Sequence, residues 1–334
     1  MTVKTKTALV TGAGGFIGSN TVKRLKKMGY WVRGVDLKYP EFEQTEADDF
    51  IIMDLRDDKN VIRALTLDNL NEKFELTFCY AADMGGAKYI FSGEHDADVM
   101  ENSAQINLNF ARHHDKINKM LWSSSACIYP LVNQMDPNNP SCAEDTWDKG
   151  ACDSPYGHEK VFSEQLYQSY RRNYGLNVKI VRFHNVFGTN GTYEPLKSKA
   201  PAATCVKVIE APENGEIEVW GTGEQTRSFI NISDALDGVF KLLDSEDFHG
   251  PVNIGSEEMI SINDLTKMVI DISGRTDLTI KNVESNCIGV NGRNSENTLC
   301  REKLKWEPKM SLREGMEKLY AWIYKEIKGV EFKK

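Results

Sequence analysis

The stretch Thr7–Gly18, TALVTGAGGFIG, decides the fold. Its first five residues form a short apolar run typical of a buried strand, and a helical pattern begins inside the glycine segment that follows. Glycines at such a turn let the backbone approach a pyrophosphate, whose charge then lies at the helix N-terminus. The spacing G-x-x-G-x-x-G therefore predicts a dinucleotide site formed by Gly12, Gly15, Phe16, Ile17 and Gly18.

The next strand pattern ends on a carboxylate. The run WVRGVD closes at Asp36, 18 residues after Gly18, where a carboxylate accepts hydrogen bonds from the ribose hydroxyls of adenosine. A carboxylate there also repels a 2′-phosphate, so we expect NAD rather than NADP, although Arg33 and Lys38 lie nearby. The alternative is a turn of the same shape that binds no cofactor.

Strand and helix patterns continue to alternate through the first half of the chain. Two further runs, 49–55 and 76–83, predict strands whose carboxyl ends contact the cofactor through Asp54, Leu55, Ala81 and Ala82. A helix is expected over Val99–His114, before the strand that leads into SSSACIYP. Repeated strand–helix units predict a parallel sheet with helices on both faces.

We therefore predict an α/β fold, with a doubly wound parallel sheet of the Rossmann type and a smaller C-terminal α/β lobe. The cofactor domain is expected to span 1–183, with 229–258 returning to it. The substrate lobe is expected to comprise 184–228 and 259–330, and it ends in an amphipathic helix over Met316–Ile327.

The composition excludes several classes of function. A net charge of −8 over 334 residues opposes non-specific binding to nucleic acid, and no apolar run is long enough to span a membrane. Seven cysteines without paired spacing favour reduced thiols in the cytosol, and the N-terminus lacks the apolar segment of a signal peptide. Because no His, Cys, Asp or Glu cluster has metal-ligand spacing, we expect no metal.

A second motif predicts catalysis. Tyr156 and Lys160 have the form Y-x-x-x-K at the start of a helical pattern, so their side chains share one helix face. An ammonium group beside a phenol stabilises the phenolate, which lets Tyr156 act as a base near neutral pH. Ser125, at the end of the preceding strand, is the best placed hydroxyl to complete the site. The alternative is a tyrosine and a lysine that meet by chance on a helix surface and have no catalytic role.

Several longer segments carry a family resemblance. They are AADMGG (81–86), SSACIYP (124–130), RFHNVFG (182–188), SKAPAA (198–203), WGTGEQTRSF (220–229), PVNIGSEEMIS (251–261) and GRNSEN (292–297). Nearly the whole chain thus resembles the extended short-chain dehydrogenase/reductase superfamily, and within it the GDP-mannose 3,5-epimerases. The resemblance implies an NAD-dependent isomerase of a nucleotide sugar that forms a homodimer.

The resemblance also gives Cys127 a role. Related dehydratases have an acidic pair after the serine, whereas this chain has Ala126 and Cys127. In the epimerase pattern, a cysteine here and the lysine of K-A-P-A-A, which matches Lys199, move protons on opposite faces of the sugar ring. We expect a thiolate at Cys127, because the pKa of a thiol falls beside cations, and a desolvated amine at Lys199. The alternatives are a packed thiol and a solvated lysine, and which group is the base at each carbon stays open.

The remaining predicted contacts lie on the substrate side. The resemblance places the nucleotide diphosphate or the sugar against Gly85, Asn185, Lys207, Gln225, Arg227 and Arg293. Three features depart from the family pattern, namely Lys88, the segment 192–198 and Asn291. They leave open another GDP- or NDP-sugar, such as a GDP-heptose, and epimerisation at C4 or at one carbon only. A non-catalytic NAD-binding interaction protein is the alternative from another class.

Overall fold

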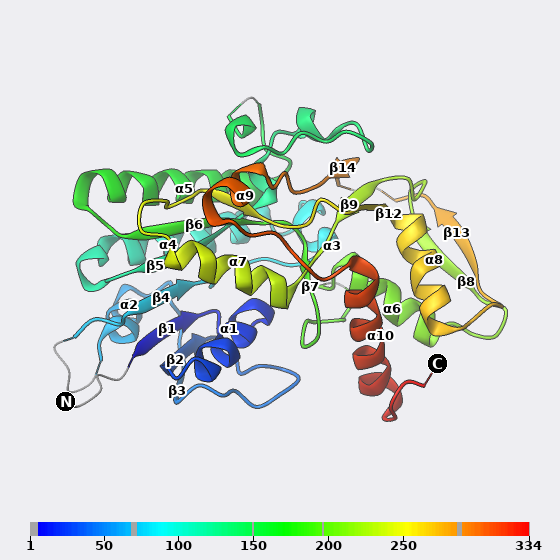
Figure 1. Ribbon diagram of the computed structural model, residues 1–334, viewed down its shortest axis with the longest axis horizontal. Coiled ribbons are helices and arrows are strands. Elements are labelled where there is room, and N and C mark those ends of the chain that lie inside the picture. The colour runs from blue at the N-terminus through cyan, green and yellow to red at the C-terminus, as the bar shows by residue number, and fades with distance from the viewer. Residues whose placement is uncertain (1–5, 68–71, 149, 196, 286–288, 334) are drawn as a thin grey trace.

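The computed structural model describes residues 6–67, 72–148, 150–195, 197–285 and 289–333. Its centre is a parallel sheet of seven strands in the order β11-β6-β5-β4-β1-β2-β3, with helices on both sides (Figure 1). The strands are β1 (Thr7–Thr11), β2 (Trp31–Asp36), β3 (Asp49–Ile52), β4 (Leu76–Cys79), β5 (Met120–Ser125), β6 (Val178–Phe183) and β11 (Val252–Ile254). The doubly wound α/β fold predicted from the sequence is confirmed.

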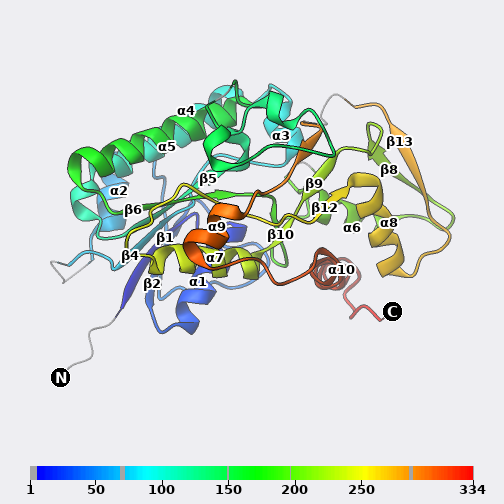
Figure 2. The same cartoon turned by 45° about the horizontal axis from the view of Figure 1, so that its top comes forward.

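Alternating side chains of the strands form two apolar cores, because successive residues of a strand point to opposite faces. On one face Ala8 and Val10 pack with α1 (Phe16–Lys27) and α7 (Ile232–Asp244). On the other face Leu9 packs with residues of three further helices, which Figure 2 shows along the opposite side of the sheet. These are α2 (Asp58–Leu65), α4 (Asp96–Arg112) and α5 (Pro155–Tyr174).

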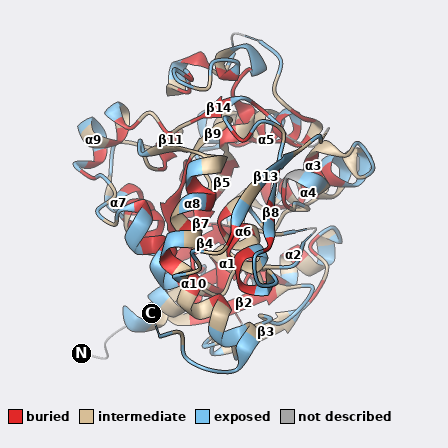
Figure 3. Cartoon of the chain, turned by 90° about the vertical axis from the view of Figure 1, so that its right-hand side faces the viewer, coloured by how far each residue is buried: buried red, intermediate tan, exposed pale blue. Residues whose placement is uncertain are grey.

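A third apolar core holds the C-terminal part of the chain together. It joins α6 (Ala200–Glu210), α8 (Ile262–Ser273) and α10 (Leu312–Lys328). Two small sheets lie beside these helices, one pairing β8 (Glu216–Trp220) with β13 (Thr279–Val283), and one with β9 (Thr226–Ser228) between β12 (Met259–Ser261) and β14 (Gly292–Arg293). Figure 3 shows the buried residues gathered between the elements and the exposed ones on the outer helix faces.

Short elements complete the fold. They are β7 (Val186–Phe187), β10 (Ile230–Asn231), α3 (Ala87–Phe91), α9 (Thr298–Leu304) and the 3-10 turns His114–Lys116, Ala126–Ile128, Leu131–Gln134 and Glu144–Thr146. After α7 the chain returns to the large sheet, where β11 pairs with β6 at one edge. The division into 1–183 with 229–258, and 184–228 with 259–330, stays a prediction.

Two predicted strands end earlier than the sequence pattern suggests. β3 stops at Ile52, because the chain turns at Asp54, whose carboxylate accepts the backbone N–H of Arg56 at 2.9 Å. β4 stops at Cys79, the residue paired with the last residue of β1, Thr11. The predicted helix over Val99–His114 is observed as α4, one turn earlier, over Asp96–Arg112.

Candidate active site

A cavity of about 890 Å³ lies at the carboxyl edge of the large sheet, where ligands of doubly wound folds bind. Every residue that the sequence predicted for the cofactor lines this cavity: Gly12, Gly15, Phe16, Ile17, Gly18, Asp36, Asp54, Leu55, Ala81, Ala82, Tyr156 and Lys160. Of the residues predicted for the substrate, Gly85, Ser125 and Lys199 also line it. One cavity therefore contains both the glycine turn and the Tyr–Lys pair.

The glycine turn has no space for side chains at Gly12 and Gly18. Gly12 has φ 69°, and a Cβ on Gly18 would lie 2.0 Å from the Gly12 carbonyl oxygen. Gly15 precedes α1 and offers no side-chain cap, so the first N–H groups of the helix are left for a ligand. This arrangement fits the pyrophosphate of a dinucleotide.

Asp36 is held in place at the end of β2. Its carboxylate accepts the backbone N–H groups of Leu37 at 2.7 Å and of Gly14 at 2.9 Å. Arg33 is buried and pairs with Asp49 at 2.7 Å, so its guanidinium is engaged away from this carboxylate. A fixed carboxylate suits ribose hydroxyls and opposes a 2′-phosphate, and the residues present therefore fit NAD.

The Tyr–Lys pair lies on the first turns of α5. Ser154 caps this helix by accepting the Gly157 N–H at 3.2 Å, and the Lys160 ammonium lies 5.4 Å from the centre of the Tyr156 ring. The same ammonium lies 3.4 Å from the Glu159 carboxylate, and both side chains are buried. Burial raises the pKa of Tyr156 well above its usual range, Cys127 and Glu159 raise it further, and the Ser125 hydroxyl lowers it. The expected phenolate is therefore not favoured by the protein alone, because burial, Cys127 and Glu159 together outweigh the Ser125 hydroxyl.

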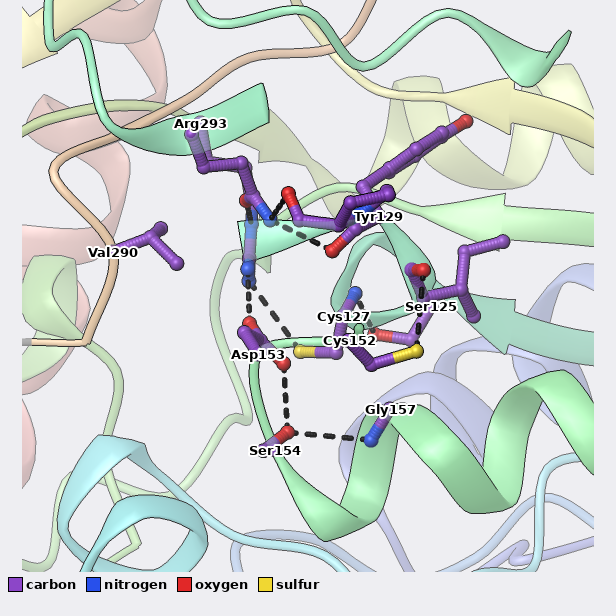
Figure 4. A network of polar contacts seen from close by, with 12 residues as sticks. Ser125, Cys127, Tyr129, Cys152, Asp153, Ser154, Gly157, Val290 and Arg293 are labelled. Carbon is purple, nitrogen blue, oxygen red and sulfur yellow. Dashed lines mark hydrogen bonds and ion pairs between the residues drawn. The ribbon is translucent and has the colours of Figure 1, made fainter. Parts of the chain in front are cut away.

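Cys127 lies in the 3-10 turn that follows β5. Its N–H donates to the Ser125 hydroxyl at 3.2 Å, and its sulfur accepts a hydrogen bond from Arg293 at 3.4 Å (Figure 4). Burial and the Asp153 carboxylate raise the pKa of the thiol, whereas Arg293 and Ser125 lower it. The expectation of a thiolate is thus corrected: a cation is present, but burial and Asp153 outweigh it.

Lys199 precedes α6 and is exposed to the cavity. The protein around the cavity lowers the pKa of the ammonium by desolvation, Cys127 raises it and Arg293 lowers it. Cys127 and Lys199 are therefore close enough for their charges to interact. The rise in the pKa of the thiol and the fall in that of the amine each favour the neutral form of the group.

Four other predicted substrate residues lie outside the cavity lining and bond to backbone carbonyls. Asn185 donates to Ser228 at 2.9 Å, Gln225 to Trp220 at 2.9 Å, and Lys207 to Glu218 at 2.6 Å. Arg227 donates to the carbonyls of Thr226 and Val290 at 2.7 and 2.6 Å, and burial and Arg293 lower its pKa to about 9. Their contacts with a nucleotide sugar stay predictions.

The partners of Arg293, another predicted substrate residue, cannot be identified from sequence motifs. Its guanidinium is buried and contacts Gln134, Cys127 and Asp153. Asp153 stands three residues before Tyr156, a position with no motif of its own, and Gln134 is the last residue of the 3-10 turn Leu131–Gln134. Only the partner arginine, 140 residues further along the chain, identifies Asp153 as part of the site.

The residues that the structure describes include neither a metal-binding group of side chains nor a helix that could cross a membrane. Within those residues, no three His, Cys, Asp or Glu side chains are grouped so as to hold a metal ion. Among the helices that they form, none combines the length and the apolar character needed to cross a membrane.

The chain belongs to the NAD dependent epimerase/dehydratase family, whose profile matches residues 8–255. GDP-mannose 3,5-epimerase of Arabidopsis thaliana is 39% identical over 323 residues, which are 95% of this chain and 82% of that protein. Together with the site described above, these similarities show that the protein is an NAD-dependent epimerase of a nucleotide sugar.

More distant proteins share the fold. A dTDP-4-dehydro-6-deoxy-D-allose reductase of Streptomyces bikiniensis is 30% identical and covers 95% of this chain and 96% of its own length. The crystal structure of a UDP-glucose 4-epimerase from Thermotoga maritima, solved with UDP-glucose, superimposes with a TM-score of 0.80 at 24% identity. The superposition covers 96% of this chain and 99% of the Thermotoga maritima chain.

Proposed function

We propose that this protein epimerises GDP-mannose, or a closely related GDP-hexose, at C3 and C5. The observation that carries the proposal is the proximity of Cys127 and Lys199: Lys199 lines the cavity, and its charge interacts with that of Cys127, which lies outside the cavity lining. Epimerisation next to a carbonyl needs one group that removes a proton and another that returns one from the opposite face. The 39% identity to a GDP-mannose 3,5-epimerase supports the choice of sugar.

The proposed reaction begins at the sugar 4-hydroxyl. Tyr156 accepts its proton, with Lys160 and Ser125 beside the phenol. When bound, NAD⁺ supplies a hydride acceptor and a positive charge. Positive charge favours the phenolate and so opposes the burial that holds the proton on Tyr156. The product of this step is a 4-ketone, which acidifies the hydrogens at C3 and C5.

Cys127 and Lys199 then act on these two carbons. One takes a proton from carbon and the other donates a proton to the opposite face, which inverts the centre. Burial favours the protonated thiol and the neutral amine, so in the resting site Cys127 is suited to donate a proton and Lys199 to accept one. Return of the proton from Tyr156 to the 4-oxygen, as the ketone is reduced, completes the cycle.

Incubation of the NAD-loaded protein with GDP-mannose in D₂O tests the proposal, with proton NMR of the nucleotide sugar as the readout. We expect deuterium at C3 and C5, together with new sugar epimers. Deuterium at one of these carbons would restrict the function to a single-centre epimerase. Absence of exchange from a protein that retains NAD would contradict the proposed sugar, and Lys88 and segment 192–198 are then the first positions to examine.

We also propose that the protein is a homodimer in the cytosol. The outer face of α5 carries a hollow of about 310 Å³ lined by aromatic and polar side chains, among them Phe162 and Tyr174. Phe162 is 47% exposed and Tyr174 62% exposed, so pairing of α5 with the same helix of a second chain would bury both. The mass of the purified protein in solution tests this, with a monomer as the contradicting result.

A further inference from the structure

The guanidinium of Arg293 is enclosed by three protein side chains. Its Nε donates to Gln134 at 2.5 Å, one terminal nitrogen donates to the Cys127 sulfur at 3.4 Å, and the other pairs with Asp153. Arg293 is 6% exposed, and the Asp153 side chain is 1% exposed. Each nitrogen of the fork thus has a fixed partner, which sets the direction from which the guanidinium meets the thiol (Figure 4).

Local structure fixes both ends of this contact. Asp153 precedes Ser154, the residue that caps α5, and accepts a hydrogen bond from the Ser154 hydroxyl at 2.7 Å. On the other side, Gly292 lets β14 approach the neighbouring loop, because a Cβ there would lie 2.6 Å from the Asp136 carbonyl oxygen. Asp153 is therefore held at the start of α5, the helix that bears Tyr156, and Arg293 is held in β14.

Charged and titratable groups surround the thiol from several elements. Those whose charges interact with Cys127 are Cys152, Asp153, Tyr156, Lys199, Arg227 and Arg293. Within this set, Asp153 alone is a carboxylate. Without it, the cations of the set would favour loss of the thiol proton, since a positive charge close by stabilises a thiolate.

We propose that Asp153 is a positioning residue, which holds the Arg293 guanidinium against the Cys127 sulfur and balances its charge, so that the thiol keeps its proton in the resting site. Asp153 and Arg293 act on the thiol in opposite directions, since the carboxylate raises its pKa and the guanidinium lowers it. The use of this proton at C3 or C5 rests on the proposed function. The effect on the thiol itself does not.

Alkylation of Cys127 by iodoacetamide measures this effect directly, because only the thiolate reacts. The NAD-loaded protein is treated without any sugar over a range of pH, and labelled Cys127 is quantified by peptide mass spectrometry. In Asp153→Asn the carboxylate charge is lost at nearly constant size, and we expect alkylation near neutral pH to become about threefold faster. In Arg293→Gln the cation is lost, and alkylation is expected to slow by a similar factor.

The opposite signs distinguish charge balance from structural damage. A purely structural role would loosen the site in both variants and accelerate alkylation in both, which would overturn the proposal, as would unchanged rates. If Asp153→Asn does not fold, Asp153→Ser removes the same charge and must give the same acceleration. Asp145→Asn removes an exposed carboxylate of the turn Glu144–Thr146, outside this set, and serves as the matched control with an unchanged rate at Cys127. The result is independent of which sugar the protein turns over.

Discussion

The two walls of the candidate active site are built in different ways. The cofactor wall (Gly12–Gly18 and Asp36) comes from adjacent strand-to-helix turns, and its close contacts involve backbone atoms. The substrate wall (Cys127, Asp153, Lys199 and Arg293) comes from distant segments, since Arg293 follows Cys127 by 166 residues. Of these four residues, Lys199 lines the cavity and the other three lie outside its lining. The first wall is therefore sensitive to added atoms in the backbone turn, whereas the second is sensitive to the charge of individual side chains.

The largest effect is expected where the two walls meet. Tyr156→Phe removes the proton acceptor for the 4-hydroxyl, and we expect turnover to fall by roughly 10²–10⁴-fold with NAD content unchanged. Steady-state turnover and the NAD released on denaturation are the measurements. Tyr170→Phe, on the same helix and outside the cavity, is the matched control. Turnover within tenfold of the original protein would remove Tyr156 from the chemistry.

The cofactor wall is tested by one added methyl group. Gly18→Ala forces a Cβ to within 2.0 Å of the Gly12 carbonyl oxygen, so the turn and α1 must separate. We expect the free energy of unfolding to fall by about 1–3 kcal/mol and bound NAD to be lost. Gly150→Ala, whose nearest contact is 3.3 Å away, is the control. Full NAD content and an unchanged melting temperature would show that the turn is not rigid.

A smaller, pH-dependent effect is expected at the base of the substrate wall. His184 is buried, shares the Asn253 side-chain oxygen with Tyr129, and its pKa is lowered from 6.5 to about 3, mainly by desolvation. The folded protein keeps this ring neutral, while the unfolded chain takes up a proton below pH 6.5. Stability is thus present above 6.5 and is lost as the pH falls toward 3, by at most about 1.4 kcal/mol per pH unit.

Denaturant unfolding at a series of pH values measures this contribution. The variant His184→Gln should show a flatter dependence on pH over the same range, because it has no ring to protonate. An identical dependence in the two proteins would assign the loss of stability to carboxylates elsewhere.

The cofactor wall was predictable because its determinants are local in the sequence. The turn at Gly12–Gly18 needs glycine for steric reasons, and Asp36 follows at the end of the next strand, so spacing alone identifies the pair. The Tyr156–Lys160 pair is equally local, because both residues lie on adjacent turns of α5.

The substrate wall could be predicted only in part. Family motifs pointed to Cys127, Lys199 and Arg293 as single residues, but their electrostatics depend on neighbours that no spacing reveals. Asp153 raises the pKa of the thiol beyond what burial alone does, which the sequence-based expectation of a thiolate did not include. Lys207 and Gln225 show the same limit, since both side chains bond to carbonyls beside β8, outside the cavity lining.

The central claim is that Cys127 and Lys199 move protons at carbon while Tyr156 serves the oxidation. Its most direct test compares the NAD-loaded protein with Cys127→Ala and Lys199→Met in D₂O with GDP-mannose, following sugar deuteration by NMR and transient NADH by absorbance. We predict that both variants still form NADH and lose deuteration at C3 and C5. Deuteration at these carbons in either variant, at the rate of the original protein, would contradict the account.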